Sequence, residues 1–141
     1  MFDPSREQAR TFFIEAWRKH AGRIPRSPIE DIALGIVIEH PEYHALLEDP
    51  EAIRRDYTPE GGQANPFLHL ALHLAIEEQL SIDQPAGIRA AFDALAARLG
   101  DRHEALHRLL ECLGETIWRS QREAAPPDGA AYLDCVRRAL G

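Results

Sequence analysis

Six of the seven histidines of this chain form three pairs with one common spacing. In each pair the two residues are four apart; the pairs are His40/His44, His69/His73 and His103/His107. On an α-helix, residues four apart lie on the same face, about 6 Å apart along the axis. Wherever such a pair lies on one helix, the spacing therefore predicts two imidazoles pointing the same way.

The rest of the sequence predicts helices as well. Ala, Leu, Glu and Arg dominate, and alternating runs of β-branched residues do not occur. We expect helices that begin at Asp3-Pro4-Ser5, at Ser27-Pro28, near Glu42, at Asp49-Pro50, at Asn65-Pro66, after Pro85, at Asp101 and near Tyr132. The 141 residues form one domain over 1–141, an all-α compact bundle of about five to seven helices. Four of these helices are expected around a core lined by His and Glu.

Several local signals fix where these helices start and stop. Ser27 is expected as an N-cap with Pro28 in the first turn and Glu30 completing a capping box. Pro41 is expected to break the helix directly after His40, because proline lacks an amide donor and disfavours helix in the preceding residue. The turn residues Thr58–Gly62 predict a loop, and the helix from Asp49-Pro50 is expected to end near Asp56.

Two helices carry patterns that predict burial. Residues 67–76 read FLHLALHLAI, which is apolar on every side except for the histidines. Such a helix is expected to be central and packed on all faces, with His69 and His73 buried. The second helix is expected to pack through Ile29, Ile32, Ala33, Ile36 and Val37.

Composition limits the classes of function. The formal net charge of −7, with scattered basic residues, argues against a nucleic-acid surface. No apolar run approaches the roughly 18 residues of a membrane span, and the amino terminus does not read as a secretory signal, so we expect a cytoplasmic protein that binds neither nucleic acid nor membrane. Cys112 and Cys135 form no CxxC motif and are expected to act as small buried hydrophobes. A long-range disulfide stays open but is disfavoured in the cytoplasm.

The histidine columns are candidate metal ligands. Two of them continue to a carboxylate one turn further on, which gives eight candidate ligands: His40, His44, His69, His73, Glu77, His103, His107 and Glu111. Eight donors suffice for two ions, and four-helix sites with mixed His and carboxylate ligands usually hold di-iron. We therefore expect two transition-metal ions, iron first, with zinc, manganese, nickel or copper as alternatives. His20, at the end of the first helix, is instead expected to interact with the helix dipole.

Other interpretations of the histidines remain. They can form a hydrogen-bonded His/Glu core or a surface cluster, and Pro41 can separate His40 from His44. Ferritin-like di-iron sites need Glu-x-x-His on two helices, and here only Glu104/His107 fits; the HExxH motif of zincins is absent. Residues near enough in sequence to act as outer partners are Glu42, Asn65, Glu78, Gln79 and Glu104, and Glu30, Glu42 or Glu78 can also join the ligands.

Three segments resemble a bacterial family catalogued as domain of unknown function 1841. They are HPEYH at His40–His44, NPFLHLALHLAIEEQLSIDQP at Asn65–Pro85 and HEALHRLLECL at His103–Leu113. The resemblance covers nearly the whole chain and implies a small stand-alone protein. It implies no activity.

Two functions compete at this point. The first is a metalloprotein, acting as a small redox enzyme or as a sensor of oxygen or nitric oxide, with a small molecule or diatomic ligand at the metal. The second is a non-enzymatic helical domain that binds a protein partner, with histidines that are structural or sense pH. No catalytic signature names a reaction, so the sequence leaves open whether the protein is an enzyme.

Overall fold

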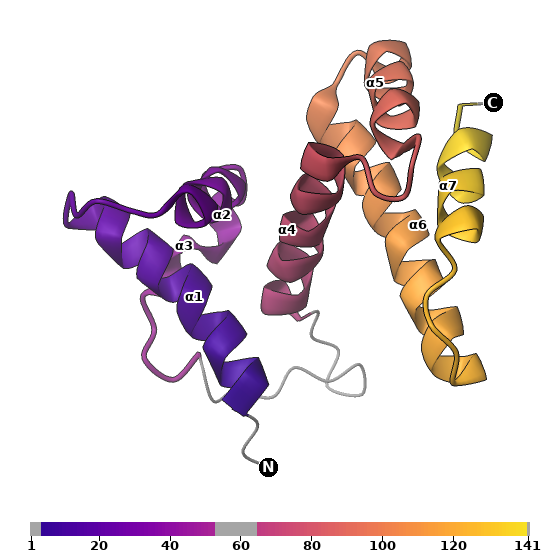
Figure 1. Ribbon diagram of the computed structural model, residues 1–141. Coiled ribbons are helices and arrows are strands. Elements are labelled where there is room, and N and C mark those ends of the chain that lie inside the picture. Colours follow the sequence, from indigo (N-terminus) through magenta and orange to yellow (C-terminus); the bar gives the residue numbers. More distant parts are fainter. Residues whose placement is uncertain (1–3, 53–64, 141) are drawn as a thin grey trace. The chain divides into compact units, whose positions relative to one another are not determined.

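The structure is a computed structural model that describes residues 4–52 and 65–140. Over these two ranges the chain forms seven α-helices, one short 3₁₀ helix and no strand, which confirms the all-α prediction. The elements are α1 (Pro4–Ala21), α2 (Pro28–Ile38), η1 (Pro41–Tyr43), α3 (His44–Leu47), α4 (Pro66–Ile82), α5 (Ile88–Leu99), α6 (Arg102–Glu123) and α7 (Gly129–Arg138), as Figure 1 shows. None of the described helices combines the length and the apolar character needed to cross a lipid bilayer.

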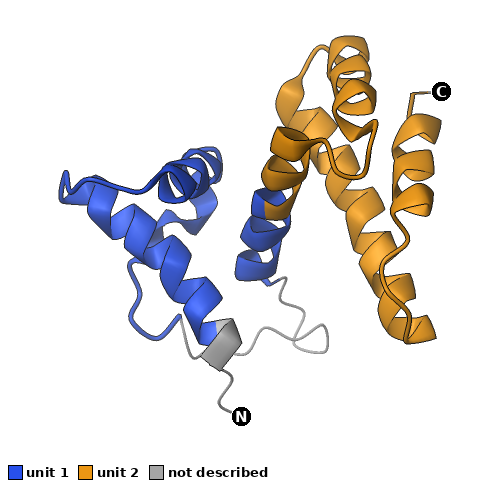
Figure 2. Cartoon of the chain, viewed as in Figure 1, with its two compact units in different colours: residues 1–74 blue, residues 75–141 orange. Residues whose placement is uncertain are grey.

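The chain divides into two compact units, coloured separately in Figure 2. Unit 1 covers Met1–Leu74 and unit 2 covers Ala75–Gly141. The boundary falls within α4, so the first half of this helix belongs to unit 1 and the second half to unit 2. A single domain over 1–141 stays a prediction.

Unit 1 is built around apolar side chains from four helices. Its buried cluster consists of Phe13 and Ala16 on α1, Ala33, Ile36 and Val37 on α2, Leu47 on α3, Ala52, and Phe67 and Leu70 on α4. The capping box at the start of α2 is confirmed: Glu30 N donates to Ser27 Oγ (3.3 Å), and Ser27 N donates to Glu30 Oε1 (2.9 Å). The capping box and the packing of α2 in the apolar core of unit 1 together position the end of α2, which His40 follows.

The predicted core face of α2 is only half right. Ala33, Ile36 and Val37 are buried, whereas Ile29 and Ile32 are 43% and 40% exposed. The reason is that α2 is apolar on more than one face, and in unit 1 it packs through one of them against α1 and η1. The apolar pattern of so short a helix does not show which face that is.

The segment after α2 contains the predicted break. α2 ends at Ile38, and His40 has φ −125° and ψ 66°, outside the helical region, directly before Pro41. The chain then makes one 3₁₀ turn before α3. The helix expected from Asp49-Pro50 does not begin there: residues 50–52 form a turn, in which Asp49 Oδ1 accepts from Glu51 N (3.0 Å). The remainder of that predicted helix and the predicted loop Thr58–Gly62 lie outside the described residues.

The start of α4 is confirmed and its burial is partly corrected. Asn65 Oδ1 accepts from the backbone amides of Phe67 and Leu68, both at 3.1 Å, as expected of an N-cap. His73 is buried at 1% exposure, but Leu68 is 55% exposed, so α4 is not packed on all faces as predicted. The apolar composition of the segment does not show which of its side chains, such as Leu68, stay exposed in the folded protein.

Unit 2 packs α5, α6 and α7 together with the second half of α4. Its core residues include Ile76, Leu80, Ile88, Phe92, Leu95, Leu106, Leu109, Leu113, Tyr132 and Val136, all buried. Asp101 caps α6 by accepting from His103 N and Glu104 N, as predicted. The hydroxyl of Tyr132 donates to Gln79 Oε1 at 2.8 Å, which ties α7 to α4.

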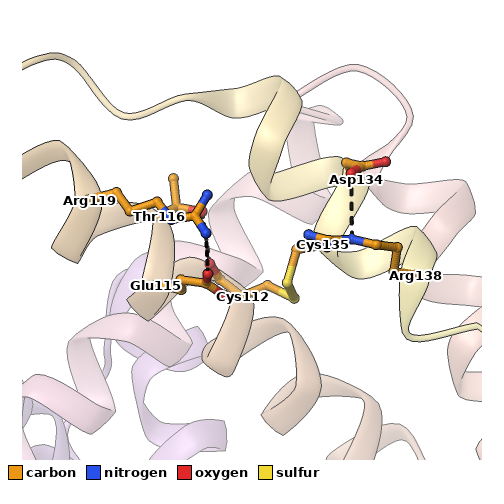
Figure 3. The surroundings of a disulfide bond; sticks show 7 residues. All are labelled: Cys112, Glu115, Thr116, Arg119, Asp134, Cys135 and Arg138. Atoms are coloured by element: carbon orange, nitrogen blue, oxygen red, sulfur yellow. Dashed lines mark hydrogen bonds and ion pairs between the residues drawn. A yellow bond between two sulfur atoms is a disulfide. The ribbon is translucent and has the colours of Figure 1, made fainter.

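The two cysteines form a disulfide, which corrects the prediction that they act as small hydrophobes. Figure 3 shows the bond between Cys112 on α6 and Cys135 on α7. The Cα atoms of the two residues are 5.8 Å apart. Cys112 is nevertheless buried, at 5% exposure, as expected. The sequence could not pair them because their approach depends on α7 packing against α6, a tertiary contact between residues 23 positions apart.

Removing the disulfide tests its contribution to stability. A cross-link that closes a loop of this size restricts the unfolded chain and adds about 3 kcal/mol to the free energy of unfolding. We expect the double variant Cys112→Ser/Cys135→Ser to lose about that amount in urea unfolding followed by circular dichroism. Wild-type protein unfolded with and without reductant provides the matched comparison. Equal stability of the two forms would contradict the assigned bond.

The lowered pKa of Glu30 predicts that this residue makes a pH-dependent contribution to the stability of unit 1. The ammonium of Lys19, 2.8 Å from Glu30 Oε2, and then the backbone amide of Ser27 lower the pKa of Glu30 from 4.5 to about 2. A lowered pKa in the folded state stabilises the protein above the unfolded pKa, and this contribution is lost as the pH falls through the folded value.

We therefore expect Glu30→Gln to lower the melting temperature at pH 7, with a difference from wild type that shrinks steadily below pH 4.5. Differential scanning calorimetry between pH 7 and pH 3 measures it. Glu123→Gln, an exposed change at the end of α6, serves as control. A difference that stays constant over this pH range would contradict the assignment.

Candidate metal centre

Three of the predicted histidines meet inside unit 1. His40 follows α2, and His69 and His73 lie one turn apart on α4. One ring nitrogen from each of the three lies within 4.8 Å of the other two. His40 and His73 are buried, at 3% and 1% exposure, and His69 is half-buried. The three imidazoles thus form a cluster mostly shielded from water, which we call the histidine cluster.

His40 is held by its own backbone neighbourhood. Its Nδ1 lies 2.7 Å from the carbonyl oxygen of Ile36. A carbonyl oxygen can only accept, so Nδ1 carries the hydrogen and donates it, and in the neutral ring Nε2 holds the lone pair. Because α2 ends just before His40, the ring can fold back on the last turn of that helix while Nε2 points away from it.

The two histidines of α4 complete the cluster. Nε2 of His69 lies 3.2 Å from Nε2 of His40. The ring centroids are 5.0 Å apart for His40 and His69, 4.7 Å for His40 and His73, and 4.8 Å for His69 and His73. The three rings therefore make a nearly equilateral triangle, with edge-to-face contacts rather than parallel stacking.

This geometry fits the spacing around one bound ion. Two imidazole nitrogens about 2.0–2.1 Å from a tetrahedral zinc lie about 3.3 Å from each other, and the centroids of their rings about 5 Å apart. The distance between Nε2 of His40 and of His69 and the three centroid distances are close to these values. The hydrogen bond from His40 Nδ1 to a backbone carbonyl is the outer contact typical of a metal-bound histidine.

The partner of His40 in its sequence pair lies elsewhere. Nε2 of His44 is 2.9 Å from the carbonyl oxygen of Val37 and donates to it, and the ring stacks on Trp17 with centroids 4.2 Å apart. The indole of Trp17 in turn donates to Glu48 Oε1 at 3.2 Å. The Pro41 break therefore sends His40 toward α4 and His44 toward α1.

The remaining predicted ligands lie in unit 2. His103 and His107 are half-buried on α6 with ring centroids 4.2 Å apart, and Nε2 of His107 is buried. Glu77 forms an ion pair with Arg102 at 3.2 Å, and Glu111 is exposed on α6. In the described part of the chain, neither carboxylate nor His44 or His103 belongs to a group of three or more side chains spaced to hold one ion.

Sequence reasoning named outer partners that the structure uses differently. Asn65 caps α4, Gln79 accepts from Tyr132, and Glu42, Glu78 and Glu104 are exposed. Two neighbours of the cluster were missed. One is the carbonyl of Ile36, which no side-chain pattern marks, and the other is Tyr43, whose place in the HPEYH segment offered the only signal.

Tyr43 lies against the cluster and is half-buried. Its ring centroid is 5.7 Å from that of His40 and 6.1 Å from that of His69. Burial, and next the charge of Glu42, raises the pKa of the Tyr43 hydroxyl. The hydroxyl therefore keeps its proton at neutral pH, and Tyr43 borders the cluster as a neutral side chain.

Comparison with known proteins identifies the family. The model of the family described as a domain of unknown function (DUF1841) matches residues 5–138. The chain belongs to this family. The matched residues run from α1 to α7. No curated protein and no solved structure matches the chain.

The tautomer of His40 is open to direct measurement. We expect the metal-free protein at pH 8 to show His40 protonated on Nδ1 and not on Nε2, because Nδ1 donates to the carbonyl of Ile36. Long-range ¹H–¹⁵N correlation spectra distinguish the two forms. His20, exposed at the end of α1, supplies an in-chain reference. An Nε2-protonated His40 would contradict the contact with Ile36.

Proposed function

We propose that this protein is a metal-binding protein whose ion is held by the histidine cluster. The observation that carries the proposal is the convergence of His40, His69 and His73, with Nε2 of His40 and of His69 only 3.2 Å apart. The residues come from two segments separated by 29 positions, so local sequence alone does not account for their meeting. A cluster of this kind could hold a transition-metal ion.

We propose one ion rather than the two that the eight-ligand prediction gave. The cluster offers only imidazole nitrogens, which all lie within 4.8 Å of one another. Two ions about 3.5–4 Å apart need more donors than this, and di-iron sites use carboxylates as well as histidines. Imidazole donors suit zinc, copper(II) and nickel as well as iron, and zinc or copper(II) is favoured where carboxylates take no part.

A fourth ligand is proposed from the sequence. Four-coordinate zinc is complete with one donor more than the cluster supplies. The eight-ligand pattern of the sequence offers His107, in the middle of its column, as the first candidate for this position, and His103, one turn earlier, as the matched comparison.

The charge of such a site indicates what it would bind. The ligands that the histidine cluster offers are uncharged imidazoles, so a bound ion keeps its full positive charge. A small anion or a diatomic molecule is then the ligand expected at any further coordination position of copper(II) or nickel. We therefore propose a metal-dependent sensor or small redox protein, rather than a hydrolytic enzyme of the HExxH type.

Metal analysis of untagged protein tests the proposal. After growth with zinc, iron and copper supplied, plasma mass spectrometry is expected to find about one ion per chain. His40→Ala, His69→Ala and His73→Ala should each lose most of it. His44→Ala and His20→Ala, which remove imidazoles outside the cluster, should keep wild-type metal content.

Two further results bear on alternatives. His107→Ala should lose metal where His103→Ala does not; equal retention in both would overturn the fourth ligand and leave the cluster proposal intact. A chelator is expected to lower the melting temperature at pH 7.5, because metal binding to a folded site is linked to folding free energy. An unchanged melting temperature in a metal-free sample would instead support the hydrogen-bonded histidine core of a partner-binding domain.

A further inference from the structure

The HPEYH segment folds as a compact turn that stacks two of its rings. Pro41 begins the 3₁₀ helix η1, and Tyr43 N donates to the carbonyl of His40 at 3.0 Å, which closes the turn. This turn brings the ring of His40, the residue before the 3₁₀ helix, beside that of Tyr43. The two rings lie parallel, with an interplanar angle of 5° and centroids 5.7 Å apart.

The same tyrosine also contacts α4. Its ring meets that of His69 nearly edge to face, at 72°, with centroids 6.1 Å apart. His40 and His69 are the two residues whose Nε2 atoms lie 3.2 Å apart. One aromatic ring therefore borders both members of the closest nitrogen pair in the cluster. The side chain of Tyr43 is half-buried.

We propose that Tyr43 is a positioning residue of the metal centre, which holds the rings of His40 and His69 in the orientation that directs both Nε2 atoms to one ion. This inference rests on the proposed function. The hydrogen bond to Ile36 fixes the position of Nδ1 of His40. The parallel ring of Tyr43 restrains the tilt of the His40 ring about that contact, and its edge-to-face contact restrains His69 as well.

The role belongs to the ring and not to the hydroxyl. The contacts of Tyr43 with the cluster are made by its ring, which lies parallel to that of His40 and edge to face with that of His69. Tyr43→Phe keeps the ring and removes only the hydroxyl, whereas Tyr43→Leu keeps a side chain of apolar character without the stacked plane. The two variants separate positioning from ligation.

Cobalt(II) binding to the full chain measures the effect. Loss of an outer contact typically costs 10–100-fold in metal affinity. We expect Tyr43→Leu to weaken Co²⁺ binding at least 10-fold, in titration against a competing chelator, and to change the visible d–d bands of the bound ion. Tyr43→Phe should retain affinity within about threefold and give the wild-type spectrum.

Trp17→Leu is the matched control. It removes an aromatic ring that stacks on His44, a histidine outside the cluster, and should leave both Co²⁺ affinity and spectrum unchanged. Equal affinity and spectra for Tyr43→Leu and wild type would overturn the positioning role. A spectrum altered by Tyr43→Phe, with the ring kept, would overturn it in favour of a direct role for the hydroxyl.

A metal-independent measurement separates this inference from the proposed function. In the apo protein, the ring current of Tyr43 should shift the imidazole proton resonances of His40 and His69, and Tyr43→Leu should abolish the shift while Tyr43→Phe preserves it. Shifts present in a wild-type protein that binds no Co²⁺ would refute the metal site and leave the stacking intact. Absent shifts would refute the stacking itself.

Discussion

The hydrogen bond between Nδ1 of His40 and the carbonyl of Ile36 determines which nitrogen of that ring is available to the cluster. It exists because α2 ends at Ile38 and the backbone of His40 leaves the helical region before Pro41. Had the helix continued, Ile36 O would have been placed to accept from a backbone amide one turn further on. The break that proline imposes thus frees a carbonyl, and the carbonyl fixes the tautomer of a candidate ligand.

The burial of the histidine cluster carries a free-energy cost unless the imidazole nitrogens have partners. Polar groups moved from water to a protein interior cost about 1–3 kcal/mol each where they lose hydrogen bonds, so imidazoles collect in a core only when their nitrogens find partners there. His40 and His73 are almost fully buried beside the apolar cluster of unit 1. A shared ion satisfies one nitrogen of every ring at once, which is why we favour a metal over a purely hydrogen-bonded core.

The disulfide introduces a tension with the expected location. Disulfides persist in oxidising compartments and are rare in the cytosol, where thiols are kept reduced. The bond between Cys112 and Cys135 in unit 2 therefore runs against the predicted cytoplasmic location. Only the absence of a membrane-spanning helix among the described residues is established.

The sequence alone determined most of the described helices and the caps of several, because these depend on residues a few positions apart, and three of its segments indicated the family. Ser27, Asn65 and Asp101 cap helices as their local patterns predicted, and the break at Pro41 follows from its ring. The sequence also identified the paired histidines as candidate metal ligands. Spacing along one helix, however, cannot say which neighbouring segment supplies the other ligands.

Tertiary packing decided those partners. The i,i+4 rule kept His69 and His73 together because both lie on α4, but it failed for His40 and His44 because the chain turns between them. Packing in unit 1 then brought His40 to α4 and His44 to Trp17. In unit 2 it joined Cys112 to Cys135. Each of these contacts joins residues distant in sequence, and only the burial of apolar faces against one another specifies such contacts.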